Sequence, residues 1–207
     1  MSKSLCCVAF DALYTRLNPQ EVPISLEEYN ERFPSKFPLK APLFVTWNRN
    51  KHLRGCIGTF LPLEIEQGTK RFAINAAFND PRFPGISKKE LTLLLDVDVT
   101  LLDNFVKLND CKNWVIGEPG LKVSIYFDGV RYSGTYLPVV AIEQGWDQVE
   151  TLESLLHKAD FEGISKLQTL EFYDKGIKEG WLELESYEGK KANLNWDEYK
   201  EIRESFN

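Results

Sequence analysis

The stretch LKVSIYFDGVRYSGTY, residues 121–136, constrains the fold of this chain more than any other. Two runs that alternate between apolar and polar residues flank Asp128-Gly129, and Asp-Gly favours the positive φ angles that a two-residue hairpin turn requires. A tight hairpin joins antiparallel strands, whereas parallel strands need a long crossover connection. The chain therefore contains an antiparallel sheet, and an all-helical or purely parallel fold is excluded.

Further strands and several helices are predicted by the same kind of pattern. The stretch LLLDVDVTLL, residues 93–102, alternates cleanly, with Asp96 and Asp98 on the polar face. Shorter runs predict strands at 43–47, 52–60 and 181–187, the first two joined by a turn at residues 48–50. Helical spacing or capping residues predict helices over 5–17, 25–33 and 65–78 and after Ser87, Asp147 and Asn195. The expected fold is α+β, a mainly antiparallel sheet flanked by helices.

Composition limits the classes of function that this chain of 207 residues can have. Its 43% hydrophobic and 27% charged residues are typical of one globular domain over residues 1–207. The net charge of −6 repels a phosphate backbone, so nucleic acid is an unlikely partner. No run reaches the ~20 apolar residues of a membrane span. Four cysteines without a C-x-x-C pair predict a reducing, intracellular compartment and neither a metal site nor a cofactor.

The most distinctive motif is LRGCIGTF, residues 53–60, on the second predicted strand. Strand alternation places Arg54 and Cys56 on one face, whereas Leu53 and Ile57 point to the core. The glycines at 55 and 58 match no phosphate-binding or dinucleotide-binding loop, so we expect them to give backbone freedom or to permit close approach, including approach of a ligand.

Cys56 is a candidate nucleophile, with a small buried residue as the alternative. An ordinary thiol, with a pKa of about 8.5, is only a few per cent ionised at neutral pH, and a partly exposed Arg54 would contribute only ~1 kcal/mol toward ionisation. His52 and His157 are the histidines of the chain, and neither is placed to form a dyad with Cys56. The sequence leaves both interpretations of Cys56 open.

Two later loops carry charged and aromatic residues of the kind found at functional sites. DPRFPG, residues 80–85, contains Arg82, which together with Arg54 would hold a carboxylate or phosphate group. LPVVAIEQGWD, residues 137–147, contains Glu143 and Asp147, either of which would serve as a base or as a partner for arginine. Helix capping by Asp147 and structural ion pairs are the alternatives.

These motifs together resemble the AMMECR domain family. The resemblance is carried in order by FVTW, LRGCIGTF, DPRFPGISKKEL, VTLLDNF, GTYLPVVAIEQGWD and TLESLLHKA, covering most of residues 43–159, and CCVAFDALYTRL is similar to the start of eukaryotic stand-alone members. It implies a compact fold of two unequal, intimately packed lobes that form a cleft lined by the LRGCIG segment. It also implies a cytosolic and nuclear location, and prokaryotic relatives occur beside a Memo-type domain and a radical-SAM protein.

The resemblance also implies a set of site residues. Cys56 would be a nucleophile or a ligand contact, Arg54 and Arg82 would be anion anchors, and Glu143 or Asp147 would be an acid–base group. The remaining ligand contacts would be Gly55, Gly58, Asp80 and Trp146. The expected function is binding of an anionic small molecule or modified residue, and whether the protein also acts on it as an enzyme is left undecided. A non-catalytic protein-interaction module and a nucleic-acid-related protein are the alternatives.

Overall fold

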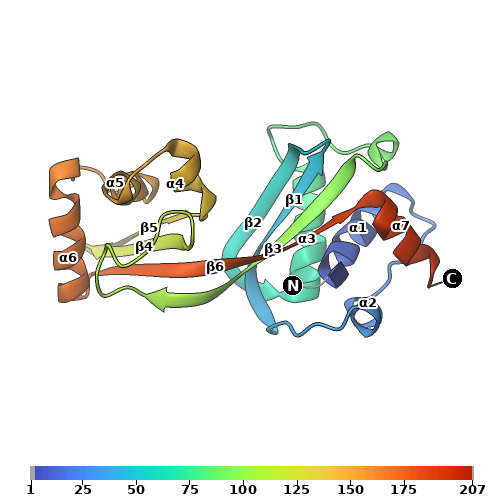
Figure 1. Cartoon of the computed structure of the whole chain (residues 1–207), viewed down its shortest axis with the longest axis horizontal. Coiled ribbons are helices and arrows are strands. Elements are labelled where there is room, and N and C mark those ends of the chain that lie inside the picture. The colour runs from blue at the N-terminus through green and yellow to red at the C-terminus, as the bar shows by residue number, and fades with distance from the viewer. Residues whose placement is uncertain (1–2, 207) are drawn as a thin grey trace. The chain divides into compact units, whose positions relative to one another are not determined.

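A computed structural model describes residues 3–206 of the chain and confirms the α+β fold. Its six strands form one antiparallel sheet with the order β2-β1-β3-β6-β4-β5. In chain order the helices and strands (Figure 1) are α1 (Lys3–Leu17), α2 (Leu26–Arg32), β1 (Lys40–Arg49), β2 (His52–Glu64), α3 (Ile65–Phe78), the 3₁₀ helix η1 (Lys88–Glu90), β3 (Leu95–Lys107), β4 (Gly120–Phe127), β5 (Val130–Tyr136), α4 (Val139–Gln144), α5 (Gln148–Lys158), the 3₁₀ helix η2 (Lys166–Gln168), α6 (Thr169–Glu179), β6 (Leu182–Asn195) and α7 (Trp196–Glu204).

The chain divides into two compact units. Among the described residues, unit 1 contains 3–102 and 190–206, and unit 2 contains 103–189. Strands β3 and β6 each contribute one segment to each unit, whereas every helix lies within a single unit. Each unit has its own hydrophobic core.

In unit 1 the two faces of the sheet differ in character. Strand β1 pairs antiparallel with β2 on one side and with β3 on the other. The odd-numbered residues Val45, Trp47, Val97 and Val99 in the middle of β1 and β3 are fully buried in one core with side chains of α1, α3 and α7. Even-numbered residues therefore form the opposite, polar face, because successive strand residues alternate between faces.

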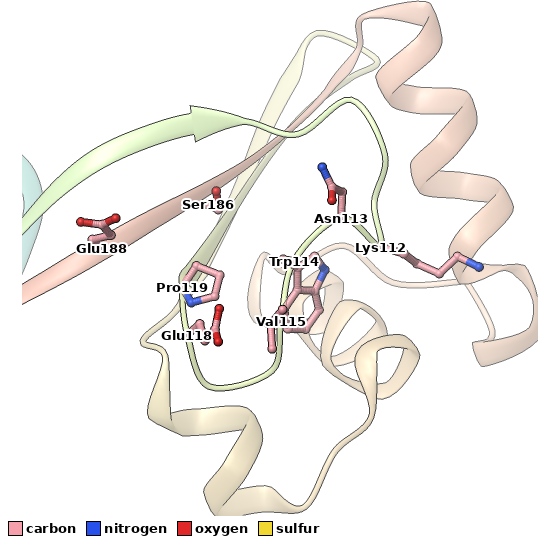
Figure 2. A pocket seen from close by; sticks show the side chains of 8 residues that line it. All are labelled: Lys112, Asn113, Trp114, Val115, Glu118, Pro119, Ser186 and Glu188. Atoms are coloured by element: carbon pink, nitrogen blue, oxygen red, sulfur yellow. The ribbon is translucent and has the colours of Figure 1, made fainter.

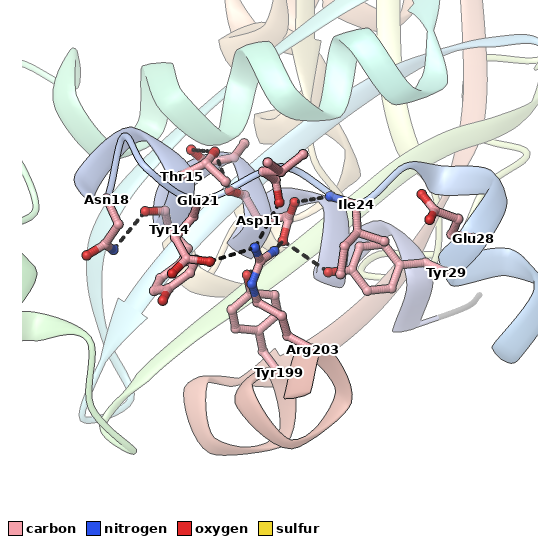
Figure 3. A network of polar contacts seen from close by, with 12 residues as sticks. Asp11, Tyr14, Thr15, Asn18, Glu21, Ile24, Glu28, Tyr29, Tyr199 and Arg203 are labelled. Atoms are coloured by element: carbon pink, nitrogen blue, oxygen red, sulfur yellow. Dashed lines mark hydrogen bonds and ion pairs between the residues drawn. The ribbon is translucent and has the colours of Figure 1, made fainter. Parts of the chain in front are cut away.

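A buried polar network within unit 1 fastens α7 to α1 (Figure 3). The Asp11 side chain is fully buried and accepts hydrogen bonds from the hydroxyls of Tyr29 (3.1 Å) and Tyr199 (2.8 Å) and from the backbone N–H of Ile24 (2.6 Å). The Arg203 guanidinium completes the network with an ion pair to Asp11. A buried carboxylate is costly without such partners, so these bonds fix the position of α7.

Unit 2 is built on the predicted hairpin. Strands β4 and β5 pair antiparallel around Asp128 and Gly129, whose φ angles are 49° and 75°. Leucines and other apolar residues of β4, α5 and β6 form the core of this unit together with Tyr173 of α6. The local preference of Asp-Gly for positive φ therefore set the turn as predicted.

Several sequence-based expectations differ from the structure. Residues 137–147 are not simply a loop, because α4 occupies Val139–Gln144, and α6 and the second half of β6 were not predicted. The β1–β2 turn lies at Asn50 and Lys51, with positive φ angles, rather than at residues 48–50. The element after Ser87 is a 3₁₀ helix with the predicted capping box. Helices α1, α3, α5 and α7 lie where their patterns predicted them.

The prediction that Leu53 points to the core is wrong. Trp47 pairs with Gly55, whereas the next residue, Asn48, pairs with Leu53, so the register between β1 and β2 shifts here and Arg54 is the extra residue. Such a bulge breaks the alternation of faces, and Leu53 is left 42% exposed. Ile57, beyond the bulge, packs against the core as expected.

No helix within residues 3–206 combines the length and the apolar composition needed to cross a membrane.

Candidate functional site

The candidate site lies at the outer edge of β2 in unit 1. The Asp80 carboxylate accepts a hydrogen bond from the backbone N–H of Cys56 (2.9 Å), and Nη2 of Arg82 donates to the carbonyl of the same residue (3.4 Å). Asp80 and Arg82 belong to the loop that follows α3. These two bonds satisfy the backbone N–H and carbonyl of Cys56, which an edge strand leaves unpaired, and they place Arg82 next to Cys56.

Asp80 and Arg82 form a tight pair. Nε and Nη2 of Arg82 donate to the two oxygens of Asp80 at 2.9 and 2.7 Å, and Asp80 also accepts the Arg82 backbone N–H. The bond from Arg82 holds the pKa of Asp80 well below its usual range, although burial acts in the opposite direction. The hydrogen bond to Asp80 is likewise the main cause of a raised pKa for Arg82, and the charge of Asp80 adds to it. Asp80 is therefore a fixed anion that orients the guanidinium.

Arg82 keeps part of its hydrogen-bonding capacity free. Its side chain is 54% exposed, and Nη1 makes no hydrogen bond to any residue in 3–206. A guanidinium held on one side by a carboxylate presents its remaining donors in a fixed direction, which suits a planar or tetrahedral oxyanion.

The Cys56 thiol is half-buried on the polar face of unit 1. The Thr46 hydroxyl donates to Sγ of Cys56 at 3.0 Å, and Thr46 is the direct cross-strand partner of Cys56 in the β1–β2 register. The thiol thus has a hydrogen-bond donor on one side and Arg82 anchored to its own backbone.

The Arg54 side chain links β2 to the segment that follows α3. Its Nε and Nη2 donate to the Glu90 carboxylate at 2.8 and 3.3 Å, and Nη1 and Nη2 donate to the carbonyls of Pro84 (2.7 Å) and Gly85 (3.3 Å). The Arg54 and Glu90 side chains are only 11% and 12% exposed. Arg54 therefore clasps the loop that carries Asp80 and Arg82, and its role as an anion anchor stays a prediction.

The two glycines of the motif permit close approach between parts of the protein. A Cβ atom at Gly55 would lie 2.0 Å from the carbonyl oxygen of Ala76 in α3, and one at Gly58 would lie 2.3 Å from the ring of Phe44. Neither glycine has a positive φ angle. The expected close approach is thus made by α3 and by Phe44, and contact of either glycine with a ligand stays a prediction.

Asp96 and Asp98 take part in a polar network on the same face as Cys56. The side-chain amides of Asn48 and Asn193 each donate to both carboxylates, at 2.9–3.2 Å, and Lys191 donates to Asp98 at 3.2 Å. In the strand register Thr46 pairs with Cys56 on one side and with Asp98 on the other. The network therefore continues the row of side chains that begins at the thiol.

The predicted site residues of the second loop all lie in unit 2. Asp147 is the N-cap of α5, where its carboxylate accepts the backbone N–H of Glu150 at 2.7 Å in a capping box. Glu143 is exposed on α4, and the ring of Trp146 packs against Tyr136 with centroids 5.8 Å apart. Helix capping, the structural alternative for Asp147, is thus present, and a catalytic or binding role for these three residues stays a prediction.

One group in residues 3–206 brings three potential metal ligands together. Asp110, Cys111 and Asp174 have ligand atoms within 4.8 Å of one another. Burial raises the pKa of Cys111 to about 12, and a hydrogen bond with Asp174 acts in the same direction. In the absence of a metal ion this thiol is therefore protonated at neutral pH.

Sequence reasoning missed several residues of the site. Thr46 and Asn48 alternate with the buried Val45 and Trp47 in FVTWN, so their position on the polar face could have been found. Lys191 and Asn193 gave no such signal, because strand β6 was expected to end at residue 187. The sequence predicts Glu90 as a capping residue, and nothing near it in the sequence indicates that it pairs with Arg54.

Comparisons with known proteins agree with the sequence motifs. The model of the AMMECR1 family matches residues 6–177. An uncharacterised protein of Schizosaccharomyces pombe is 39% identical over 165 residues, 78% of this chain and 82% of that protein, and one of Kluyveromyces lactis is 37% identical over 213 residues, 93% and 90% of the two chains. The crystal structure of an uncharacterised protein from Pyrococcus horikoshii has the same fold, with a TM-score of 0.64, 24% identity and coverage of 93% and 92%. The chain therefore belongs to the AMMECR1 family.

Proposed function

We propose that this protein binds an anionic small molecule or an anionic modified residue at the edge of β2, with Arg82 as the anion anchor and Cys56 as the adjacent contact. The observation that carries the proposal is the half-exposed Arg82 guanidinium, which Asp80 holds in place while Nη1 keeps its donors for a ligand.

In this proposal Cys56 contacts the ligand and is the group that would react with it. The thiol has Thr46 as a donor and an arginine bound to its own carbonyl. Arg54 acts indirectly by holding the loop with Asp80 and Arg82. The site uses residues of unit 1 alone, so it does not depend on Glu143, Trp146 or Asp147.

Charge-selective alkylation tests the proposal. Iodoacetate is an anion and iodoacetamide is its neutral counterpart, and both alkylate thiols. If Arg82 attracts anions to Cys56, the ratio of the iodoacetate rate to the iodoacetamide rate should fall at least threefold in Arg82→Gln, and inorganic phosphate should protect the wild-type thiol. Arg71→Gln, which changes an exposed arginine of α3, is the matched control and should keep the wild-type ratio.

Two results of this experiment would contradict the proposal. An unchanged ratio in Arg82→Gln would show that Arg82 does not serve as the anchor. Because Arg82→Gln also leaves the Asp80 charge without its partner, the double variant Asp80→Asn/Arg82→Gln is measured as well. If this double variant regains the wild-type ratio, repulsion by Asp80 explains the loss and the proposal fails.

A non-catalytic interaction module is the second candidate function. It is favoured by the internal use of the motif: Arg54 binds Glu90, Gly55 faces α3 and Gly58 faces Phe44. On this interpretation LRGCIG fixes the strand and the loop, and a partner binds elsewhere on the protein. A Cys56→Ser protein that retains every cellular function of the wild type would favour the module over the thiol-centred site.

A further inference from the structure

The outer edge of β2 has unpaired backbone groups close to Arg82. The N–H and the carbonyl of Cys56 point away from β1, since Asp80 and Arg82 bind them. Outward-pointing groups recur at every second residue of a strand, and the β1–β2 register is regular over residues 55–59, so the N–H and the carbonyl of Gly58 also point outward. They make no hydrogen bond with a side chain or loop within residues 3–206. Such an edge can accept an additional strand.

The groups along this edge follow a fixed order. Gly58 and Cys56 are two residues apart, which corresponds to about 6.8 Å along an antiparallel strand. The carbonyl of Cys56, where Nη2 of Arg82 binds at 3.4 Å, lies on the side of Gly58, and the N–H of Cys56, where Asp80 binds, lies beyond it. A chain that is added along the edge from Gly58 therefore meets the Arg82 guanidinium first. It cannot pair with Cys56, because both outward groups of that residue are already bound.

The charge of Arg82 selects the direction and the end of such a chain. A segment that pairs antiparallel with β2 runs from Gly58 toward Cys56 in its own N-to-C direction, so its C-terminal carboxylate arrives at Arg82. A parallel segment would bring its N-terminal ammonium group to the same place, where like charges repel. Nη1 of Arg82 binds no residue in 3–206 and the side chain is 54% exposed, so this group can donate to the carboxylate.

The face of the sheet that bears Gly58 offers apolar contacts to the last residue of the chain. Side chains of directly paired residues lie on the same face of a sheet. On this face a Cβ atom at Gly58 would lie 2.3 Å from the ring of Phe44, and the ring of Phe60 packs against that of Phe44 with centroids 5.1 Å apart. Both rings are partly exposed. A residue paired with Gly58 would therefore place an apolar side chain against these rings.

We infer that the edge of β2 binds the C-terminal end of an extended peptide from a partner protein. The last residue of the peptide pairs with Gly58 through its main chain: its N–H donates to the Gly58 carbonyl, and one carboxylate oxygen accepts the Gly58 N–H. The other carboxylate oxygen accepts a hydrogen bond from Nη1 of Arg82. This inference rests on the proposed function, because it uses the same anchor, and it specifies the anion as the carboxylate of a chain end.

The open pocket of unit 2 does not suit such a chain end. It has a volume of about 520 Å³ and lies between β6 and the loop that joins β3 to β4 (Figure 2). Two of its lining residues, Glu118 and Glu188, carry carboxylates that would repel the carboxylate of a peptide. Lys112 is the cation of the lining, and its side chain points away from both carboxylates in Figure 2. Trp114, which also lines this pocket, therefore reports on binding away from β2.

Calorimetric titration of the full-length protein with a defined peptide tests the inference. The probe is acetyl-Val-Thr-Val with a free carboxylate, and its C-terminal amide is the matched neutral peptide. The acid should bind saturably, at least tenfold tighter than the amide, and more weakly at higher salt. In NMR spectra the backbone N–H resonance of Gly58 should shift on binding, whereas the indole N–H of Trp114 should not. Absence of saturable binding, equal affinities for the two peptides, or an unshifted Gly58 resonance would each overturn the inference.

Variants of Arg82 test the contact with the carboxylate. Arg82→Gln should bring the affinity of the acid to within twofold of that of the amide. The double variant Asp80→Asn/Arg82→Gln should do the same, which would exclude repulsion by the Asp80 charge as the cause. Arg71→Gln, in α3, is the control and should bind both peptides as the wild type does. An acid-to-amide ratio that is unchanged in Arg82→Gln would overturn the inference.

A change in the peptide tests the main-chain pairing. Methylation of the last peptide nitrogen removes the donor to the Gly58 carbonyl and should weaken binding of the acid at least threefold. If methylation has no effect, the carboxylate binds without strand pairing and the inference fails. The proposed function would in that case still be supported by phosphate protection of Cys56 and by the effect of Arg82→Gln on the iodoacetate ratio, since neither requires main-chain pairing.

Discussion

Replacing Arg54 tests whether this motif residue is a structural clasp. Arg54→Ala removes two bonds to the Glu90 carboxylate and two to backbone carbonyls, at 2.7–3.3 Å, from side chains that are 11% and 12% exposed. Breaking a fully buried ion pair costs ~3–5 kcal/mol. Glu90 retains two bonds from Ser87, so we expect a loss of ~2–3 kcal/mol in the free energy of unfolding.

The assay is urea unfolding of the single and double variants of Arg54 and Glu90. A loss of this size lowers the melting temperature of a chain of this length by ~4–12 °C. The cycle made with Glu90→Gln should give a coupling energy of ~1 kcal/mol or more, because the two groups contact each other directly. Arg49→Ala is the control: Arg49 lies 3.6 Å from Glu90 and is 51% exposed, so its loss should cost under ~0.5 kcal/mol.

The same variant should show a defined dependence on pH. Burial by itself would raise the pKa of Glu90, but the bonds from Arg54 and Ser87 outweigh it and lower the pKa from 4.5 to about 2. A lowered carboxyl pKa gives stability that is complete above about 4.5 and is lost as the pH falls toward 2. The difference between wild type and Arg54→Ala should therefore shrink over this range. A cost under ~0.5 kcal/mol at pH 7, or a coupling energy near zero, would refute the clasp.

Three other variants or reagents test separate parts of the structure. Gly55→Ala should destabilise the protein by more than ~3 kcal/mol in chemical unfolding, since its Cβ would meet the Ala76 carbonyl at 2.0 Å; a wild-type midpoint would contradict this packing. In the folded protein a thiol reagent should modify one cysteine, Cys56, and in urea all four, because the others are buried; mass spectrometry counts the adducts. Asp11→Ala should cost ~3–5 kcal/mol by leaving Arg203 without its buried partner, and a thermal melt unchanged from wild type would refute this.

The parts of the fold that the sequence predicted correctly depend on near neighbours in the chain. The Asp128-Gly129 turn, the capping box at Ser87, the helix starts at Asp147 and Asn195, and the alternation of β3 each follow from contacts within a few residues. The second half of β6 and the helix α6 lack such signals. Residues 188–195 are mostly polar, and they form a strand because neighbouring strands supply hydrogen bonds to them.

The candidate site was likewise predicted only in part from the sequence. The sequence indicated that Cys56, Asp80 and Arg82 belong together through the family motif, and the structure shows Asp80 and Arg82 on the backbone of Cys56. The sequence did not indicate that the guanidinium of Arg54 would be bound by the carboxylate of Glu90. A one-residue bulge in β2 gives Arg54 its own direction, and strict alternation cannot predict a bulge that depends on pairing with β1.

The sequence by itself determined an antiparallel α+β fold, the positions of most helices and the family of this protein. Local backbone preferences, capping and hydrophobic periodicity act over a few residues and can be recognised without coordinates. Only the tertiary structure decided which arginine is free: Arg54 is neutralised by Glu90, 36 residues later, whereas Arg82 is oriented by Asp80 and half-exposed. Such partners are chosen by packing between distant segments, because ion pairs form where the fold brings the charges together and removes water.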